Sequence, residues 1–506
     1  MRPPTDRAMH IASSKPTAGE FLSFISVLCL LLCGSIGYAQ QSATPETPQQ
    51  ELQRLKQAVD QAQAQVDSSQ QQLIELKKSL ALLEQRLAPG NPVTSETQAV
   101  ITPTGSATPP TAPTEMQERQ AMQESQIATL NQIKVESESK YPVKISGLIL
   151  LNTFINTSQV DNASAPTIAV AGGGSTGASL RQTVLGIDAR GPSLAGADSH
   201  ADVRVDFFGS SLDSSYQAGG LLRLRTAHAT LDWKDTELFA ELDRPILSPN
   251  QPSSLTAIAQ PALAWSGNLW MWSPQVGVSH TMDFVSSSRI AVEAALIDVP
   301  DSPAIYTAIA GTVSQGERSR WPGGELHVGL LGKKDGSGAS IGVGGYFSPH
   351  KIMGGTGYNA WASTLDANLP LPHGLEFSGN FYRGQALGGL GGGAYKDFVY
   401  GMNLEYAKPL DDVGGWAQLK KRAGQRWEFN GAFGLDNGFA SELRRYVLPT
   451  SSYQNQARNQ TFTANTIYSP SAYLLFSLEY RHLSTAPITG APANTNIIGI
   501  AAGYKF

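Results

Sequence analysis

Cysteine is almost absent from this chain of 506 residues, which contains only Cys29 and Cys33. Both lie in one short apolar run, 21–34, that follows three basic residues. The run is shorter than a membrane-spanning helix needs, and the sequence Gly-Tyr-Ala at 37–39 is typical of the cleavage site of a secretory leader. We therefore expect residues 1–39 to be a signal peptide. A mature chain without cysteine would have no disulfide, no thiol nucleophile and no thiolate metal site.

Charged residues are also scarce, at 16% of the chain, and the net charge is -5. This acidic balance argues against nucleic acid as a partner. Long hydrophobic runs are missing beyond the leader, and the mean hydropathy of -0.18 is too polar for a bundle of membrane helices. Glycine, in contrast, is plentiful, with 50 residues. This composition is compatible with a membrane β-barrel, whose strands alternate between lipid and a polar lumen.

The last segment of the chain, 496–506, alternates strictly between two faces. One face is apolar and ends in Tyr504 and Phe506, and the other is small and ends in Lys505. The last strand of a barrel must pair with the first, so that no backbone edge is left unpaired in lipid. The pattern therefore predicts a closing strand that pairs with 142–156. The alternative is a terminal strand of a soluble β-sandwich.

Segments with a period of two residues recur from Tyr141 to the end of the chain, separated alternately by short turns and long loops. Their length suits strands that cross a bilayer at a tilt. They predict about 16 antiparallel strands, and hence an all-β transmembrane barrel over 141–506. The segment 397–408 also looks strand-like. Counting it would give an odd number of spanning strands, and the two ends of the barrel segment would then lie on opposite sides of the membrane. We therefore expect 397–408 inside a long external loop.

Ahead of the barrel, the segment 49–87 repeats apolar or small residues at alternating steps of three and four. A sustained period of 3.5 residues is typical of a coiled coil. We expect an α-helical coiled coil over 40–88, in the periplasm, that promotes self-association. An amphipathic helix lying on the barrel is the alternative. Residues 89–140 form a Pro/Thr-rich linker followed by a polar segment.

Charged side chains recur at short spacings on the early strands. A charge facing lipid costs roughly 2–4 kcal/mol near the midplane of the bilayer, so most of these residues should face the lumen. A basic ladder opposed by acids would create a transverse field that sets ion preference. Ordinary solvated lumen residues without a role toward solutes are the alternative. The pore-lining candidates are Arg181, Arg204, Asp206, Arg223, Arg225 and Glu241.

The long segment 244–272 is expected between the fifth and sixth strands. It is rich in proline and tryptophan and contains apolar residues, such as Leu255 and Ile258, that suit a water-exposed loop poorly. We expect this loop to fold inward and narrow the pore. A contact within a trimer or a place on the cell surface is the alternative.

The sequence shows no catalytic set. Residues 173–177, Gly-Gly-Ser-Thr-Gly, match the Gly-x-Ser-x-Gly pattern of serine hydrolases, but that motif needs a strand–turn–helix context and no helix is expected here. The eight histidines are scattered, without the close spacing of metal ligands. We therefore expect a protein that is not an enzyme and that uses no metal and no cofactor.

Five segments make the chain similar to the DcaP-like porins of the Gram-negative outer membrane: 205–209, 222–228, 414–419, 439–444 and 476–483. The order of leader, coiled coil, linker and barrel is similar as well.

This resemblance implies a homotrimeric channel in outer-membrane lipid, through which small polar solutes diffuse passively. These solutes are often anions such as dicarboxylates, and Arg204, Arg223 and Arg225 would be lumen arginines. The Gly-rich loop 385–396 blurs the family pattern. The alternative function is a structural or adhesive surface protein that the barrel merely anchors.

Overall fold

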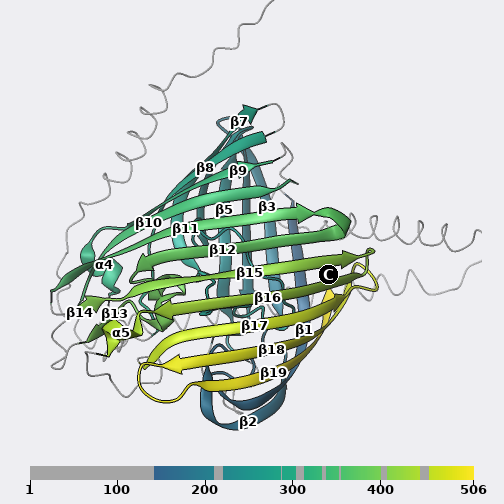
Figure 1. Ribbon diagram of the computed structural model, residues 1–506. Coiled ribbons are helices and arrows are strands. Elements are labelled where there is room, and N and C mark those ends of the chain that lie inside the picture. Colours follow the sequence, from purple (N-terminus) through teal and green to yellow (C-terminus); the bar gives the residue numbers. More distant parts are fainter. Residues whose placement is uncertain are drawn as a thin grey trace, which may run out of the picture. The chain divides into compact units, whose positions relative to one another are not determined.

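The computed structural model describes residues 142–209, 220–285, 288–303, 313–332, 338–352, 355–400, 407–444 and 455–506. The predictions of a signal peptide, a coiled coil and a linker lie outside these ranges. Within them the regular secondary structure is almost entirely antiparallel β-strand (Figure 1). No helix in the described ranges is long and apolar enough to cross a membrane.

Sixteen antiparallel strands of the described chain close into one barrel, which confirms the predicted barrel fold. In order around the ring they are β1 (Val143–Val160), β3 (Val184–Leu194), β4 (Ala197–Asp206), β5 (Arg223–Asp232), β6 (Thr236–Asp243), β7 (Ser273–Val285), β8 (Ser288–Ile297), β9 (Gly323–Leu331), β10 (Ser340–Lys351), β11 (Gly357–Leu371), β12 (Leu375–Gln385), β15 (Asp411–Ala423), β16 (Trp427–Gly438), β17 (Gln456–Tyr468), β18 (Leu474–Pro487) and β19 (Ala493–Lys505).

The short helical elements lie in the connections between strands. They are α4 (Gln315–Ser319), α5 (Ala440–Leu443) and the 3-10 turns η2 (Pro372–Gly374), η3 (Gly388–Leu390) and η4 (Gly393–Tyr395). Helix α4 begins with a capping box, in which the Ser314 hydroxyl accepts from the Glu317 N–H and the Glu317 carboxylate accepts from the Ser314 N–H. Such reciprocal bonds stabilise a helix that is too short to persist by itself.

The last strand closes the ring as its alternation predicts. Strand β19 pairs with β1 from Leu148↔Lys505 to Asn156↔Ile497, and the backbones of Gly147 and Phe506 exchange two hydrogen bonds of 3.0 Å. The face that carries Ile500 and Tyr504 is exposed on the outside of the barrel, whereas Ile497 and Ala501 are buried. The backbone groups at this seam are therefore paired, and the sheet has no open edge there.

The sequence does not predict one strand, β2 (Ala169–Ser179), and instead places 158–178 in a loop. Strand β2 pairs with the second half of β1, at 152–160, whereas β3 pairs with the first half, at 143–148. It thus adds a seventeenth strand to the sheet without becoming part of the ring. Its glycine, alanine and serine residues give no alternation of apolar and polar side chains, so the usual signal of a strand is missing. The Gly-x-Ser-x-Gly pattern lies inside this strand.

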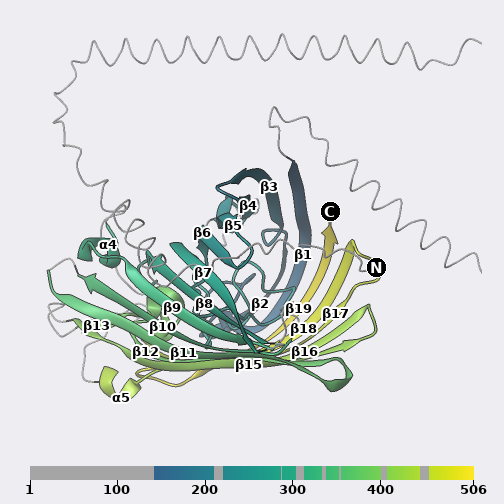
Figure 2. The same ribbon diagram turned by 90° about the horizontal axis from the view of Figure 1, so that it is seen from above.

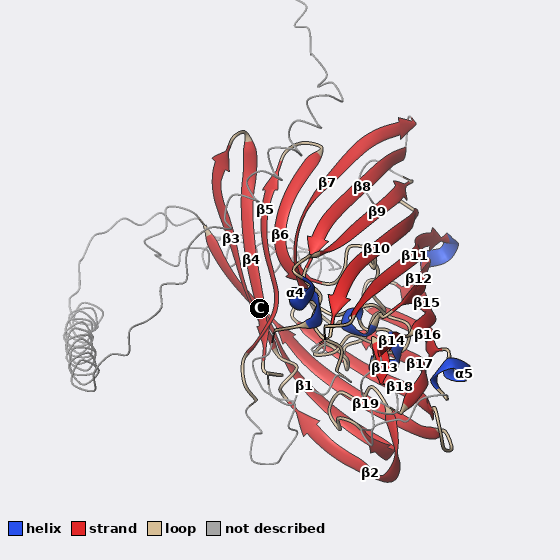
Figure 3. Cartoon of the chain, turned by 90° about the vertical axis from the view of Figure 1, so that its left-hand side faces the viewer, coloured by secondary structure: helices blue, strands red, loops and turns tan. Residues whose placement is uncertain are grey.

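Two long connections enter the space that the barrel encloses (Figure 2, Figure 3). The first, 244–272, joins β6 to β7, the fifth and sixth strands of the ring; it is called the inward loop below. The second, 386–410, joins β12 to β15 and is called the brace segment. It contains β13 (Phe398–Tyr400) and β14 (Ala407–Pro409), which pair with each other in a separate sheet. The described strands of the segment 397–408, β13 and β14, therefore lie outside the barrel wall, as predicted, but the connection enters the barrel and is not an external loop.

The inward loop reaches strands on several sides of the barrel. The Ile246 N–H donates to Glu325 on β9 over 2.8 Å, and the Ser253 N–H donates to Gln418 on β15 over 2.6 Å. Its apolar residues Leu255 and Ile258 pack against wall residues that include Leu150. The prediction of an inward fold is confirmed, and burial against the wall explains why a loop contains these apolar side chains.

Candidate functional site

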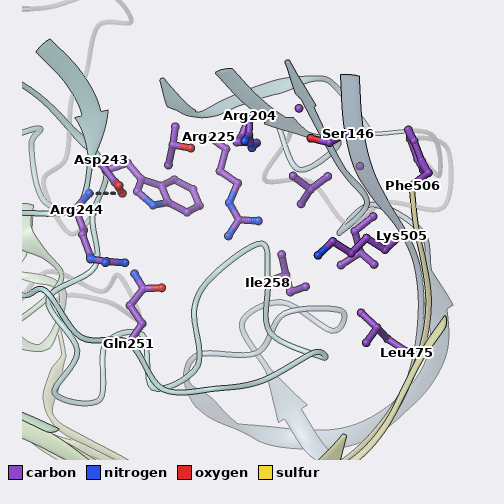
Figure 4. Close-up of a pocket in the computed structure, with 16 residues that line it drawn as sticks. Ser146, Arg204, Arg225, Asp243, Arg244, Gln251, Ile258, Leu475, Lys505 and Phe506 are labelled. Carbon is purple, nitrogen blue, oxygen red and sulfur yellow. Dashed lines mark hydrogen bonds between the residues drawn. The ribbon is translucent and has the colours of Figure 1, made fainter. Parts of the chain in front are cut away.

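A cavity of about 580 Å³ lies beside the inward loop, lined by residues of β1, β3–β6, β18 and β19 (Figure 4). One part of its lining is apolar and includes Leu148, Val184, Ile258, Leu475 and Phe506. The charged residues of the lining are the cations Arg204, Arg225, Arg244 and Lys505 and the acid Asp243. Cations therefore outnumber acids in this lining.

Arg225 points into this cavity from an irregular part of β5. Opposite it, successive β4 residues Arg204 and Val205 pair with Thr226 and Leu224, so Arg225 is an extra residue in the ladder. Such a bulge re-aims side chains. The guanidinium lies 5.0 Å from the ring centre of Trp272. Its Nη1 is buried and has no hydrogen-bond partner among the described residues, so an anionic acceptor there would satisfy a costly unpaired donor.

Arg204 also lines the cavity, but its charge is compensated. Its Nη2 lies 2.5 Å from Asp188 Oδ1 and its Nη1 lies 3.4 Å from Asp202 Oδ2. The side chain crosses Gly186, where an added Cβ would lie only 2.8 Å from Arg204 Cδ. Glycine at this position therefore gives Arg204 the room to reach Asp188.

Arg223 and Asp206 form a two-pronged pair on β5 and β4. Arg223 Nε and Nη2 donate to the two carboxylate oxygens over 3.0 and 2.6 Å, and Asp206 is fully buried. Arg223 Nη2 also donates to the Ala259 carbonyl of the inward loop over 2.6 Å. Charge-assisted bonds of this geometry are strong, so this pair fastens the loop to the wall.

Arg181 and Glu241, like Arg223 and Asp206, are not part of the cavity lining. Arg181 is buried, with its guanidinium 4.2 Å from the ring centre of Phe208. Glu241 accepts a hydrogen bond from Gln275 over 2.8 Å and lies 3.9 Å from His228. Of the six predicted pore-lining residues, the structure brings two into the cavity lining, Arg204 and Arg225, and places four outside it: Arg181, Asp206, Arg223 and Glu241.

The sequence prediction did not include three further side chains of the cavity: Arg244, Trp272 and Lys505. The alternation of the last strand could have predicted Lys505 as a cavity residue, because Lys505 continues the inner face of β19. Arg244 and Trp272 lie at the two ends of the inward loop, and Arg244 Nη2 donates to the Pro249 carbonyl over 2.9 Å. Their positions depend on the path of the loop, which strand alternation does not determine.

Gln182 holds the inward loop from the side of β3. Its Nε2 donates to the carbonyls of Ser164 and Thr256 over 3.1 and 2.9 Å. Its Oε1 accepts from the N–H groups of Ile258 and Ala259 over 2.8 and 3.1 Å. The side chain is completely buried, and these four bonds use all four of its hydrogen-bonding positions.

Backbone strain is concentrated in the inward loop and the brace segment. Five non-glycine residues there have positive φ angles: Leu263 (61°), Trp265 (60°), Ala386 (57°), Ala394 (44°) and Tyr395 (74°). Each such conformation costs about 1–3 kcal/mol and persists only where the surroundings hold it. The two segments are therefore fixed by their contacts and not by local preference.

No family model matches this sequence, and no curated protein matches it. Solved structures do match. The outer membrane channel DcaP of Acinetobacter baumannii superposes with a TM-score of 0.56 at 15% identity, over 73% of this chain and 99% of that chain. An anion-selective porin from Comamonas acidovorans gives a TM-score of 0.45 at 10% identity, over 72% and 100%. Pseudomonas putida OprB gives 0.44 at 9% identity, over 76% and 97%.

The likeness to DcaP shows the fold. The described part of this chain has the barrel fold of an outer-membrane channel.

Proposed function

We propose that this chain is a DcaP-like channel of the outer membrane, through which small anionic solutes diffuse passively past the inward loop. The observation that carries the proposal is Arg225, which lines a cavity rich in cations and whose buried Nη1 has no hydrogen-bond partner among the described residues. Dicarboxylates are the solutes we propose, because Arg225 could bind one carboxylate while Arg244 or Lys505 attracts the other.

The physical basis is the sign of the field beside a loop that narrows the lumen. Charged side chains that line a pore set its preference for anions or cations. Arginine suits carboxylates because its planar guanidinium can donate two parallel hydrogen bonds. Arg204 is already paired with acids, so the net attraction comes mainly from Arg225, Arg244 and Lys505. No bond of the solute changes, so no catalytic group and no cofactor is needed.

We propose further that the chain acts as a homotrimer. The coiled coil over 40–88 would lie in the periplasm and join three copies, and barrel walls would add contacts between them. The linker and polar segment, 89–140, would connect this coiled coil to the barrel.

Conductance in planar bilayers tests the channel and its sign preference. Under a KCl gradient the wild-type reversal potential should show anion preference, and Arg225→Gln should move it toward zero. Arg383→Gln is the matched control, because Arg383 pairs with Asp411 at 3.2 Å and lies 4.9 Å from the Phe439 ring, away from the cavity lining. Absence of any conducting state would refute the channel. An unchanged reversal potential in Arg225→Gln would refute the anion site.

Liposome swelling tests the solute class. Dicarboxylates should enter faster than neutral or cationic solutes of the same size, and Arg225→Gln should remove the difference. Equal rates for the three classes in the wild type would contradict the dicarboxylate preference.

A further inference from the structure

A row of aromatic rings connects the brace segment to Arg225. The Tyr395 ring stacks on Trp265, with centres 4.2 Å apart and planes 20° apart. Trp265 meets Trp270 edge-on at 6.0 Å, and Trp270 meets Trp272 edge-on at 5.5 Å. Trp272 lies 5.0 Å from the guanidinium of Arg225. The row therefore begins at 395 in one connection and ends at the cavity.

The row is tightly packed. Tyr395, Trp265 and Trp270 are 2%, 3% and 4% exposed. Gly391 fits against Trp270 so closely that an added Cβ would lie 2.9 Å from Trp270 Cδ1. A close-packed interior leaves no room for one ring to change its orientation alone. Trp272 itself is only half-buried, and the guanidiniums of Arg223 and Arg225 both lie 5.0 Å from its ring centre. Its orientation therefore depends on Trp270 behind it and on the two arginines in front of it.

The brace segment is anchored at the start of this row. The Gly393 N–H donates to Asp412 Oδ2 and the Ala394 N–H donates to Asp436 Oδ2, each over 2.8 Å. The Tyr395 hydroxyl donates to Thr167 Oγ1. Ala394 and Tyr395 both have positive φ angles, so these bonds hold the ring in place against the local preference of the backbone.

We propose that Tyr395 is a positioning residue for Arg225, which acts through the tryptophan row to set the anion preference of the channel. This inference rests on the proposed function of Arg225. The flat face of Trp272 supports the guanidinium through a cation–π contact and directs it into the cavity. Without the Tyr395 ring the tryptophans repack, and Arg225 loses this face. The guanidinium then turns toward Asp243 of the same cavity lining, which cancels its charge.

Two substitutions at Tyr395 separate the ring from the hydroxyl. Tyr395→Phe retains the stack and loses the bond to Thr167, so the ratio of anion to cation permeability should stay at the wild-type value. Tyr395→Leu removes the ring, and the ratio should fall by about threefold or more, toward the value of Arg225→Gln. The measurement is the reversal potential under a KCl gradient, on barrels whose folding is verified by heat-modifiable migration in gel electrophoresis.

A double variant distinguishes positioning from general loosening of the pore. If Tyr395 acts through Arg225, then adding Tyr395→Leu to Arg225→Gln should leave the permeability ratio unchanged. An equal fall in both backgrounds would overturn the proposal, and so would a wild-type ratio in Tyr395→Leu alone. If Arg225→Gln itself keeps the wild-type ratio, the proposed function fails, and that result is obtained without any change at Tyr395.

Gly391→Ala provides a second route if Tyr395→Leu does not fold. The added methyl group would lie 2.9 Å from Trp270 Cδ1 and 3.1 Å from the Trp270 backbone nitrogen, and the φ angle of 102° strains alanine at this position. Both effects displace Trp270, so the permeability ratio should fall as well. A wild-type ratio in a folded Gly391→Ala barrel would overturn the proposal.

Discussion

Thr256 in the inward loop donates its hydroxyl hydrogen bond to Oε1 of Glu479 on β18, over 2.7 Å. Ser254 donates to the other carboxylate oxygen over 2.5 Å, and Arg481 forms an ion pair with the same group at 2.6 Å. Glu479 is only 2% exposed. A buried carboxylate is tolerated only when its oxygens are bonded. The loop hydroxyls therefore stabilise the buried Glu479 of the wall, and Glu479 in turn holds the loop in place.

Glu479→Gln should therefore destabilise the barrel. The amide keeps the shape of the side chain, but its nitrogen cannot accept the bond of a hydroxyl, and Arg481 is left without its counter-charge. We expect the free energy of unfolding in detergent to fall by about 3 kcal/mol. Glu428→Gln is the control, because Glu428 is partly exposed and lies 3.7 Å from Arg422; its cost should be below about 1 kcal/mol. Equal losses for both variants would contradict the anchoring role.

Gln182→Leu should loosen the inward loop. Leucine has a similar size but leaves two carbonyls and two N–H groups of the chain without partners. Because a buried unsatisfied group costs about 1–3 kcal/mol, hydrogen exchange at Ile258 and Ala259 should accelerate by at least about tenfold. Gln385→Leu is the matched change away from the loop, since Gln385 contacts Asp411 at 3.4 Å. If the amides of Ile258 and Ala259 still exchange slowly in Gln182→Leu, the loop is held by other contacts.

The brace segment should become more stable above neutral pH. Burial lowers the pKa of Lys396 from 10.5 to about 7, although Asp436 and Asp412 face it. Between these values the unfolded segment binds a proton that the folded one does not, so stability increases as the pH rises from about 7 to about 10. Burial also raises the pKa of the neighbouring Asp397 to about 7, but that effect operates below pH 7.

Protection factors for hydrogen exchange at Gly393 and Ala394, corrected for the intrinsic rate, measure this change. They should increase between pH 7 and 10 in the wild type and stay flat in Lys396→Met. Lys351→Met, at the exposed end of β10, should retain the wild-type profile. A flat wild-type profile would refute the role of Lys396.

Removal of Phe506 should impair closure of the barrel. The truncated chain loses the two backbone bonds to Gly147 and an aromatic side chain of the cavity lining. The fraction that folds into lipid vesicles, read from heat-modifiable migration, should fall severalfold because the seam between β1 and β19 is shortened. Phe347→Ala is the control, as Phe347 is 54% exposed on β10. Similar yields for the two variants would argue against a special role of the last residue.

Deletion of 40–88 should weaken the proposed homotrimer and leave the barrel folded, because the described barrel residues close the ring among themselves. Light scattering in detergent would follow the mass of the assembly. A trimer that survives the deletion unchanged would remove this role from the predicted coiled coil.

The strands were predictable because they alternate. Alternation in the sequence predicts a strand over 236–243, and β6 has the same bounds. Alternation over 199–209 places His200, Asp202 and Arg204 on one face, and these residues share one face of β4. Strand β2 was not predictable, since its pairing with β1 involves backbone groups and its small side chains leave no pattern.

The site was predictable only in part. Arg204 follows from the alternation of its strand, whereas Arg225 lies at a bulge that alternation does not locate. The expected basic ladder is interrupted, since Asp188 and Asp206 neutralise Arg204 and Arg223. The contacts of Arg181 with Phe208 and of Trp272 with Arg225 join segments whose approach depends on the path of a long loop. Periodicity describes a strand and its neighbours and contains no information on such distant contacts.

The inward loop has a mechanical consequence. It is tied to β9 through Glu325, to β11 through Thr364 and to β17 through Asn465, over 2.8, 3.0 and 2.8 Å. We expect these ties to make the loop an internal strut that resists flattening of the barrel cross-section. In the proposed channel, a substitution that releases this loop should therefore soften the wall as it widens the passage.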